Sequence, residues 1–113
     1  MIHELTLHPG PFALIKSGNK DIEMRLYDER RKNIKIGDFI RFTNRETNET
    51  LIVEVINLYR FSNFDELYKF FDKKRLGYKE DEIANPNDME IYYSKDKIKQ
   101  YGTLAIEIKL LVK

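Results

Sequence analysis

The strongest restriction on the fold of this chain is a period-two alternation of apolar and polar side chains across residues 20–27. Side chains alternate between the two faces of a β-strand, so the pattern predicts a half-buried strand. The apolar positions on its buried face are Ile22, Met24 and Leu26. The opposite face holds Asp21, Glu23, Arg25 and Tyr27, and it is therefore the chemically richer one.

Four further segments have the pattern or the composition of strands. Residues 39–43 and 51–59 are rich in β-branched and aromatic side chains, and the polar residues 44–50 between them predict a hairpin connection. Residues 4–7 form a short extended opening, and residues 103–112 are strongly apolar with strand-like alternation. A last strand that returns beside an early one would close the sheet into a barrel.

Short helices are predicted between the strands. A first helix starts at Pro11, because proline suits the first helical turn, and it stops at Gly18. Ser62 or Asn63 can cap a second helix. The apolar stripe of this second helix, which we expect to lie in the core, consists of Phe64, Leu67, Tyr68, Phe70 and Phe71.

The stretch after the second helix loses its periodicity. Residues 77–87 predict a long loop, which is uncommon in a compact domain unless it serves a purpose. Residues 88–93 resume helical spacing, and Ser94 can cap a further helix that Gly102 closes. The order of these elements predicts an α+β fold in which helices flank or plug a curled sheet.

The composition limits the class of protein. A length of 113 residues suits one domain over residues 1–113, and 42% hydrophobic with 35% charged residues is typical of a globular protein. The chain has no cysteine, which excludes disulfides, thiolate metal sites and a cysteine nucleophile. It shows no leader pattern and no long apolar run, so we expect a cytoplasmic protein without membrane contact.

The net charge gives no general argument for nucleic-acid binding. The chain has 20 Lys and Arg residues against 19 Asp and Glu residues, for a net charge of +1. Any contact with nucleic acid must therefore come from a local cluster. The candidate cluster lies in the charged segment 28–35, which we expect to be exposed, and consists of Arg30, Arg31, Lys32 and Lys35. A solvated loop is the alternative interpretation of that segment.

Three segments of the chain resemble ASCH domains. Residues 14–25 end an apolar helix and then carry the signature of the family, with Gly18, Lys20, Glu23 and Arg25 at its spacing. Residues 36–42 resemble the Gly-Asp turn that leads into a barrel strand of that family, and residues 101–108 resemble its closing Tyr-Gly strand. The resemblance implies a PUA-like small mixed β-barrel flanked by short helices, a fold shared with modules that bind RNA or recognise bases.

The resemblance implies two alternative functions. One is a noncatalytic module that binds RNA or a nucleotide, through a nucleobase or a phosphate, in a charged cleft. The other is a small amidohydrolase acting on N4-acetylcytidine, since Lys20 matches the catalytic Lys of a bacterial branch of the family. That branch has a Thr where this chain has Glu23, and Glu82 lies in the loop region that holds its Glu. This departure favours binding over hydrolysis, and whether the chain is an enzyme stays open.

The candidate site residues suit either function. In a binding cleft, Glu23 can accept from an exocyclic amine, Arg25 can donate to a carbonyl or phosphate, and Lys20 supplies a point charge. Candidate rings for stacking on a base are Tyr27, Tyr59 and Tyr93. In an enzyme, a partly buried Lys20 with a lowered pKa can activate water, while Glu23 or Glu82 moves protons.

Alternation sets one geometric condition on this site. A strict strand places Lys20 on the opposite face from Glu23 and Arg25, so the three share a cleft only if Lys20 belongs to a preceding turn or a bulge re-aims it. A surface ion pair beside a solvated lysine is the alternative. His3 and His8 lack clear carboxylate partners, so we expect no metal and no other cofactor. The expected partner is RNA or a modified nucleoside, and the sequence indicates neither its identity nor the oligomeric state.

Overall fold

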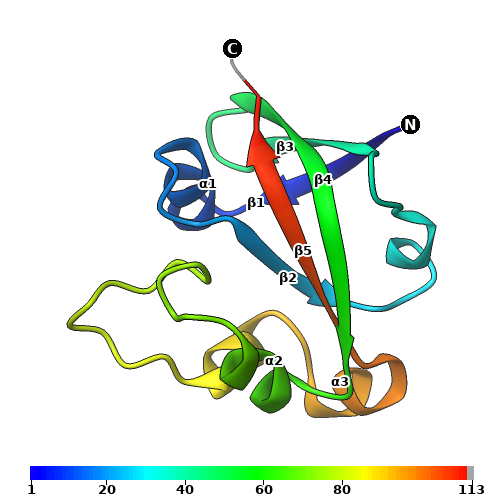
Figure 1. Cartoon of the computed structure of the whole chain (residues 1–113), viewed down its shortest axis with the longest axis vertical. Coiled ribbons are helices and arrows are strands. Elements are labelled where there is room, and N and C mark those ends of the chain that lie inside the picture. The colour runs from blue at the N-terminus through cyan, green and yellow to red at the C-terminus, as the bar shows by residue number, and fades with distance from the viewer. Residues whose placement is uncertain (112–113) are drawn as a thin grey trace.

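Five strands form one curled sheet with short helices around it, as the computed structural model of residues 1–111 shows (Figure 1). The strands are β1 (Ile2–Leu7), β2 (Ile22–Leu26), β3 (Phe39–Asn44), β4 (Thr50–Phe61) and β5 (Thr103–Leu110). The α-helices are α1 (Pro9–Lys16), α2 (Phe64–Phe70) and α3 (Lys95–Tyr101), and two short 3-10 helices are η1 (Arg31–Asn33) and η2 (Pro86–Ile91).

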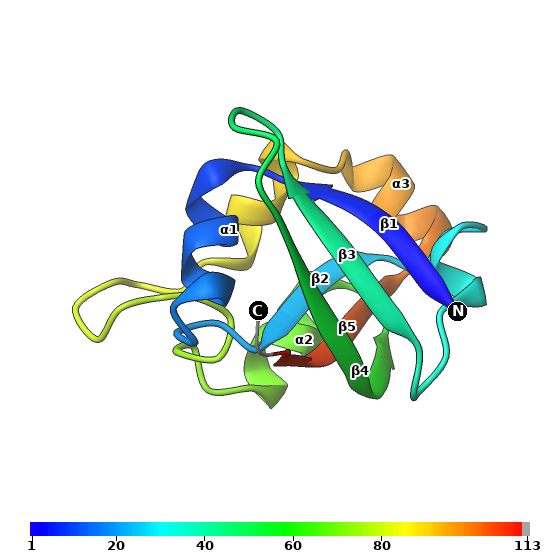
Figure 2. The same cartoon turned by 90° about the horizontal axis from the view of Figure 1, so that it is seen from above.

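The strand order is β1-β3-β4-β5-β2, so β1 and β2 lie at the two edges of the sheet. The β1–β3 ladder is parallel, and the other three are antiparallel. The β4–β5 ladder contains a register shift between Val55 and Asn57, a β-bulge that helps the sheet to bend. The last strand returns beside the early strand β2, as predicted, and the sheet curls into a half-barrel, so that β3 and β4 cross in front of β2 in Figure 2.

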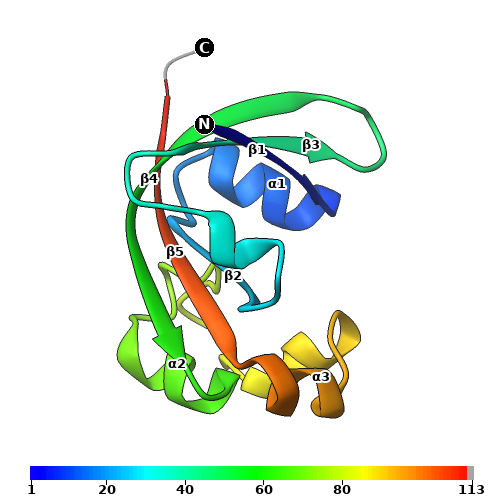
Figure 3. The same ribbon diagram turned by 90° about the vertical axis from the view of Figure 1, so that its right-hand side faces the viewer.

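The curled sheet has a buried cluster on each side. The concave side encloses α1, as Figure 3 shows, and the two buried residues of this helix, Phe12 and Ile15, join the inward-facing side chains of β1, β3, β4 and β5. The convex side of β2 packs against α2 and η2 through Phe64, Leu67 and Met89. The α+β class predicted from the order of elements is confirmed.

The strand β2 is buried on both faces, so the prediction of a half-buried strand was wrong. Its apolar residues pack in the convex cluster, and Glu23 and Arg25 on the other face are also buried. A strand at the edge of a sheet is ordinarily exposed, but here Arg25 contacts Thr6 of β1, and the Arg75 carbonyl in the segment after α2 accepts from the backbone N–H of Ile22 at the start of β2. The charged face of the strand therefore points into the protein.

The helix boundaries differ from the predicted ones in two places. The helix α1 begins at Pro9 instead of Pro11. The first backbone N–H groups of a helix have no intrahelical partner, so a proline in the first turn, which lacks this group, costs no hydrogen bond. The helix α2 ends at Phe70, which is 62% exposed, whereas Phe71 beyond the end is buried. The expectation that the whole aromatic stripe is core was therefore wrong at Phe70.

The capping predictions for α2 and α3 are confirmed. The Asn63 side chain accepts from the Glu66 N–H, and the Ser94 hydroxyl accepts from the Lys97 N–H. The loop prediction holds from residue 77 to Asn85, after which η2 begins. Val112, the end of the predicted last strand, lies outside the described residues.

The segment 28–35 is less exposed than predicted. It contains η1, and Ile34 at its end is buried in the concave core. Arg31 is half-buried and forms an ion pair with Asp28. Among residues 1–111, no helix has the length and apolar character that crossing a membrane requires.

Candidate functional site

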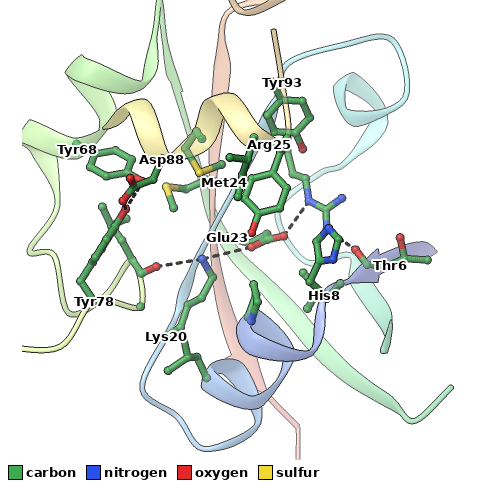
Figure 4. A pocket seen from close by; sticks show the side chains of 18 of the residues that line it. Thr6, His8, Lys20, Glu23, Met24, Arg25, Tyr68, Tyr78, Asp88 and Tyr93 are labelled. Carbon is green, nitrogen blue, oxygen red and sulfur yellow. Dashed lines mark hydrogen bonds and ion pairs between the residues drawn. The ribbon is translucent and has the colours of Figure 1, made fainter. Parts of the chain in front are cut away.

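A cleft of about 470 Å³ opens where the two edge strands approach each other. Its walls come from the end of β1, the start of α1, β2, the segment 76–82 and η2 with the residues that follow it. Figure 4 shows Lys20 and Glu23 in the middle of the cleft, with Tyr78 on one side and His8 on the other. The size lies in the range of small-molecule sites.

The three residues of the family signature converge in this cleft. The Lys20 Nζ atom lies 3.5 Å from Glu23 Oε1, and the Arg25 Nε atom donates to Glu23 Oε2 at 2.8 Å. Their exposed fractions are 6%, 4% and 8%, respectively. The carboxylate is thus placed between two cations in a buried position, and the alternative of a surface ion pair beside a solvated lysine is wrong.

The convergence depends on a turn, as the alternation rule requires. Lys20 precedes β2 and lies in the turn that follows α1, and its N–H donates to the Leu14 carbonyl at 3.1 Å. Gly18 in this turn has φ +85°, a left-handed conformation that favours glycine at the end of a helix. The turn releases Lys20 from the strand alternation and lets its side chain enter the same cleft as Glu23.

The segment after α2 holds Lys20 from the other side. The Lys20 Nζ donates to the Leu76 carbonyl at 3.1 Å, deep in the protein. Gly77 follows with φ +107°, and a Cβ atom there would lie 3.3 Å from Lys20 Cδ and 3.1 Å from Leu14 Cδ1. A glycine is therefore suited to this position both by conformation and by space.

Arg25 contacts both the cleft residue Glu23 and the neighbouring edge strand β1. Its Nη2 atom donates at 2.8 Å to the Thr6 carbonyl near the end of β1, while its Nε atom binds Glu23. One guanidinium group thus bridges β2 and β1, the two ends of the strand order.

Burial and mutual attraction shift the pKa values of all three groups. Burial lowers the pKa of Lys20, and the Glu23 carboxylate only partly offsets this effect. Burial alone would raise the pKa of Glu23, but Arg25 and Lys20 outweigh it and hold that pKa below its ordinary value. Burial also opposes the charge on Arg25, yet Glu23 keeps the pKa of Arg25 raised. The result is a firmly ionised Glu23–Arg25 pair beside a lysine that loses its proton more easily than a free one.

Tyr93 is the one tyrosine of the three predicted stacking candidates that lines the cleft among the described residues. Its ring stacks on Phe64 at a centroid distance of 6.1 Å. Tyr27 instead lies under the Arg60 guanidinium, 3.9 Å from its ring centroid. Tyr59 packs against Phe71 and donates to Glu107, so neither of these two rings faces the cleft.

A hydrogen-bonded chain of hydroxyls forms a cleft wall that the sequence did not indicate. The Tyr68 and Tyr78 hydroxyls lie 2.9 Å apart, and the Tyr78 hydroxyl donates to Asp88 Oδ2 at 2.7 Å. Burial raises the pKa of Tyr78, and its hydrogen bonds with Tyr68 and Asp88 add to the effect. The three residues lie ten apart in α2, in the loop and in η2, so no local spacing pattern could have found them.

Glu82, the candidate for a catalytic glutamate, lines the cleft but is exposed. Its carboxylate accepts from the Lys79 N–H at 2.6 Å, and its backbone carbonyl accepts from Lys73.

The basic cluster lies outside the cleft. Arg31 and Lys32 form ion pairs with the acidic residues of their own segment, Asp28 and Glu29. Arg30 and Lys35 are exposed and do not line the cleft either. The four basic residues are therefore not part of the cleft.

The arrangement offers donors, acceptors and aromatic rings in one concave site. The Glu23 oxygens have acceptor capacity beyond their two cations, and the Arg25 guanidinium has N–H groups beyond the two that are engaged. Within residues 1–111, no group of three His, Asp or Glu side chains has the arrangement of a metal site.

Comparisons with known proteins agree with this fold. The ASCH domain family matches residues 5–112. The crystal structure of hypothetical protein PH0355 has 32% identity and a TM-score of 0.83, covering 98% of this chain and 100% of that one. The solution structure of Protein PF0455 from Pyrococcus furiosus has 33% identity and a TM-score of 0.77, with 100% of both chains covered.

A more distant structure, the ASCH domain from Lactobacillus crispatus JV V101, has 13% identity and a TM-score of 0.65. The alignment covers 96% of this chain and 79% of that one, and at such low identity it supports the fold alone. No curated protein matches the chain. The expected PUA-like α+β architecture is confirmed, and the chain belongs to the ASCH domain family.

Proposed function

We propose that the cleft binds a nucleobase, either of a free nucleoside or nucleotide or of a base extruded from RNA. The observation that carries this proposal is the buried Lys20–Glu23–Arg25 trio at one cleft, next to the ring of Tyr93. Base recognition needs hydrogen bonds to the base edge and a surface that packs against its face. The buried trio can supply such hydrogen bonds, and the ring of Tyr93 can supply such a surface.

Each member of the trio has a role in this proposal. The Glu23 carboxylate stays ionised and accepts a hydrogen bond from an exocyclic amine or ring N–H. The remaining N–H groups of Arg25 donate to a base carbonyl. Lys20, already bound to Leu76, completes the polar floor. Because the three side chains are fixed before the ligand arrives, little conformational entropy is lost on binding.

Calorimetric titration with the four ribonucleosides, N4-acetylcytidine and a short single-stranded RNA tests the proposal. At least one of these ligands is expected to bind saturably and to raise the melting temperature of the protein. Preference for the free nucleoside or for the RNA distinguishes the two sources of the base. If none of them binds, the proposal is wrong.

A second function, hydrolysis of an acylated exocyclic amine such as that of N4-acetylcytidine, is favoured by the lowered pKa of Lys20. A buried lysine that loses its proton more easily than a free one is better suited to act as a general base. In this proposal Lys20 takes a proton from the attacking water, the oxygen bonds to the acyl carbon, and the C–N bond breaks. Lys20 then returns that proton to the leaving nitrogen, directly or through Glu82, while Glu23 stays ionised, so the products are cytidine and acetate.

Chromatography of N4-acetylcytidine after incubation with the protein tests the hydrolytic proposal. Release of cytidine that disappears in Lys20→Ala supports it. Absence of turnover in the wild-type protein contradicts it and leaves the binding proposal in place. Turnover that persists unchanged in Lys20→Ala removes Lys20 from the mechanism.

A further inference from the structure

The mouth of the cleft carries a cation outside the buried trio. Arg45 is the first residue after β3, and its N–H donates to the Leu7 carbonyl at 2.9 Å, which fixes the hairpin to the end of β1. Its side chain is exposed and lines the cleft. The Arg45 Nη1 atom lies 3.3 Å from His8 Nε2, so the hairpin and the residue before α1 meet at this point.

His8 has a second contact that fixes its position. Its ring lies against Tyr92, with 5.4 Å between the ring centroids. The exposed imidazole thus contacts both Arg45 and an aromatic ring. Three separate parts of the chain, at residues 8, 45 and 92, thus position two nitrogen-bearing side chains at the edge of one cleft.

The charges of the cleft are distributed unevenly. Lys20 and Arg25 share the Glu23 carboxylate, whereas no ion pair is found for Arg45 within the described part of the chain. The other two acidic residues of the lining, Glu82 and Asp88, belong to the segment after α2, and Figure 4 shows Asp88 on the far side of the cleft from His8. An anionic group of a ligand would be repelled by that wall and attracted to the Arg45 side.

We propose that Arg45 and His8 form a phosphate subsite at the mouth of the cleft, so that the ligand is a nucleotide. A guanidinium group has five N–H donors, and His8 engages one nitrogen, which leaves donors for a phosphate. The inference rests on the proposed binding of a nucleobase, because it assigns the sugar–phosphate end of that same ligand. The phosphate is either the monoester of a mononucleotide or a diester of RNA.

The test compares a nucleoside with its phosphates. Calorimetric affinities are measured for each ribonucleoside, for N4-acetylcytidine, for the matching 5′- and 3′-monophosphates, and for a dinucleotide that carries a diester. The preferred monophosphate or dinucleotide is expected to bind about tenfold tighter than its nucleoside, as one charge-assisted hydrogen-bonded contact provides. A larger gain for the dinucleotide identifies RNA as the source of the phosphate.

Three variants test whether Arg45 provides the gain in affinity of the nucleotide over its nucleoside. Arg45→Gln is expected to remove it without changing nucleoside affinity, and Arg45→Lys is expected to keep part of it because the charge is retained. Lys97→Gln on α3 removes one exposed positive charge outside the cleft lining, so it is expected to keep the full gain.

The possible results separate the two proposals. Equal affinity for nucleoside and nucleotide overturns the phosphate subsite but leaves nucleobase binding intact. A gain that persists in Arg45→Gln, or that is lost equally in Lys97→Gln, also overturns it. Absence of binding by every nucleoside and nucleotide contradicts the proposed function itself and the subsite with it.

Discussion

The Arg25 guanidinium donates to the Thr6 carbonyl at 2.8 Å and so connects the two edge strands of the curled sheet. The same group binds Glu23 at 2.8 Å in the cleft. One side chain therefore takes part both in the contact between the edge strands and in the candidate site. Substitutions in the trio are expected to change the stability of the fold as well as the binding of a ligand.

Glu23→Gln is expected to lower the free energy of unfolding by about 3 kcal/mol, because it leaves two buried cations without their carboxylate. Urea denaturation measures this loss. Glu82→Gln serves as the matched control, since Glu82 lines the same cleft but is exposed, and it is expected to unfold with the wild-type midpoint. Equal effects of the two substitutions would contradict the buried position of the trio.

The stability of the protein is expected to depend on pH through Glu23. Its pKa in the folded state lies below the ordinary value, so its contribution is fully present above that value and is lost as pH falls through the folded-state pKa. Between about pH 7 and pH 3, the wild type should lose more stability than Glu23→Gln. Parallel curves of unfolding free energy against pH would show that Glu23 makes no such contribution.

Gly77→Ala is expected to destabilise the protein by about 1–3 kcal/mol, because the residue has φ +107° and the new methyl group would press on Leu14 and Lys20. Thermal or urea unfolding measures the effect. Gly10→Ala is the control, since Gly10 lies in α1 and a Cβ atom there meets nothing within 4 Å. That control should be neutral or slightly stabilising, and a comparable loss at both glycines would contradict the explanation.

Tyr93→Leu is expected to weaken nucleobase binding by about tenfold, since the loss of one stacking ring costs about 1–3 kcal/mol. Tyr27→Leu removes a tyrosine that packs under Arg60 outside the cleft lining, and it should leave the affinity unchanged. If Tyr27→Leu weakened binding and Tyr93→Leu did not, the base would bind on a different surface.

The sequence was informative where a local pattern carries the structure. Alternation and the signature spacing predicted β2 and the shared cleft of Lys20, Glu23 and Arg25, together with the need for a turn at Lys20. Turns and caps depend on one or two residues, so the cap of α2 could be narrowed in advance to Ser62 or Asn63, and the structure selects Asn63.

The rest of the cleft depends on contacts between distant parts of the chain. Tyr68, Tyr78 and Asp88 meet only because the loop after α2 folds back over the site. In the same way, a tyrosine in an alternating pattern does not reveal whether its ring meets a cleft, as with Tyr93, or a neighbouring aromatic ring, as with Tyr59. The surroundings of such a ring are determined by tertiary packing and not by local propensity.

The central claim is that the cleft around Glu23 binds a nucleobase, and an NMR titration of the ¹⁵N-labelled protein with ribonucleosides tests it most directly. The account predicts saturable shifts of the amide signals of Lys20, Glu23, Arg25, Gly77 and Tyr93, with little change in residues 30–35. Shifts confined to residues 30–35, or no saturable shifts with any nucleoside, would contradict it.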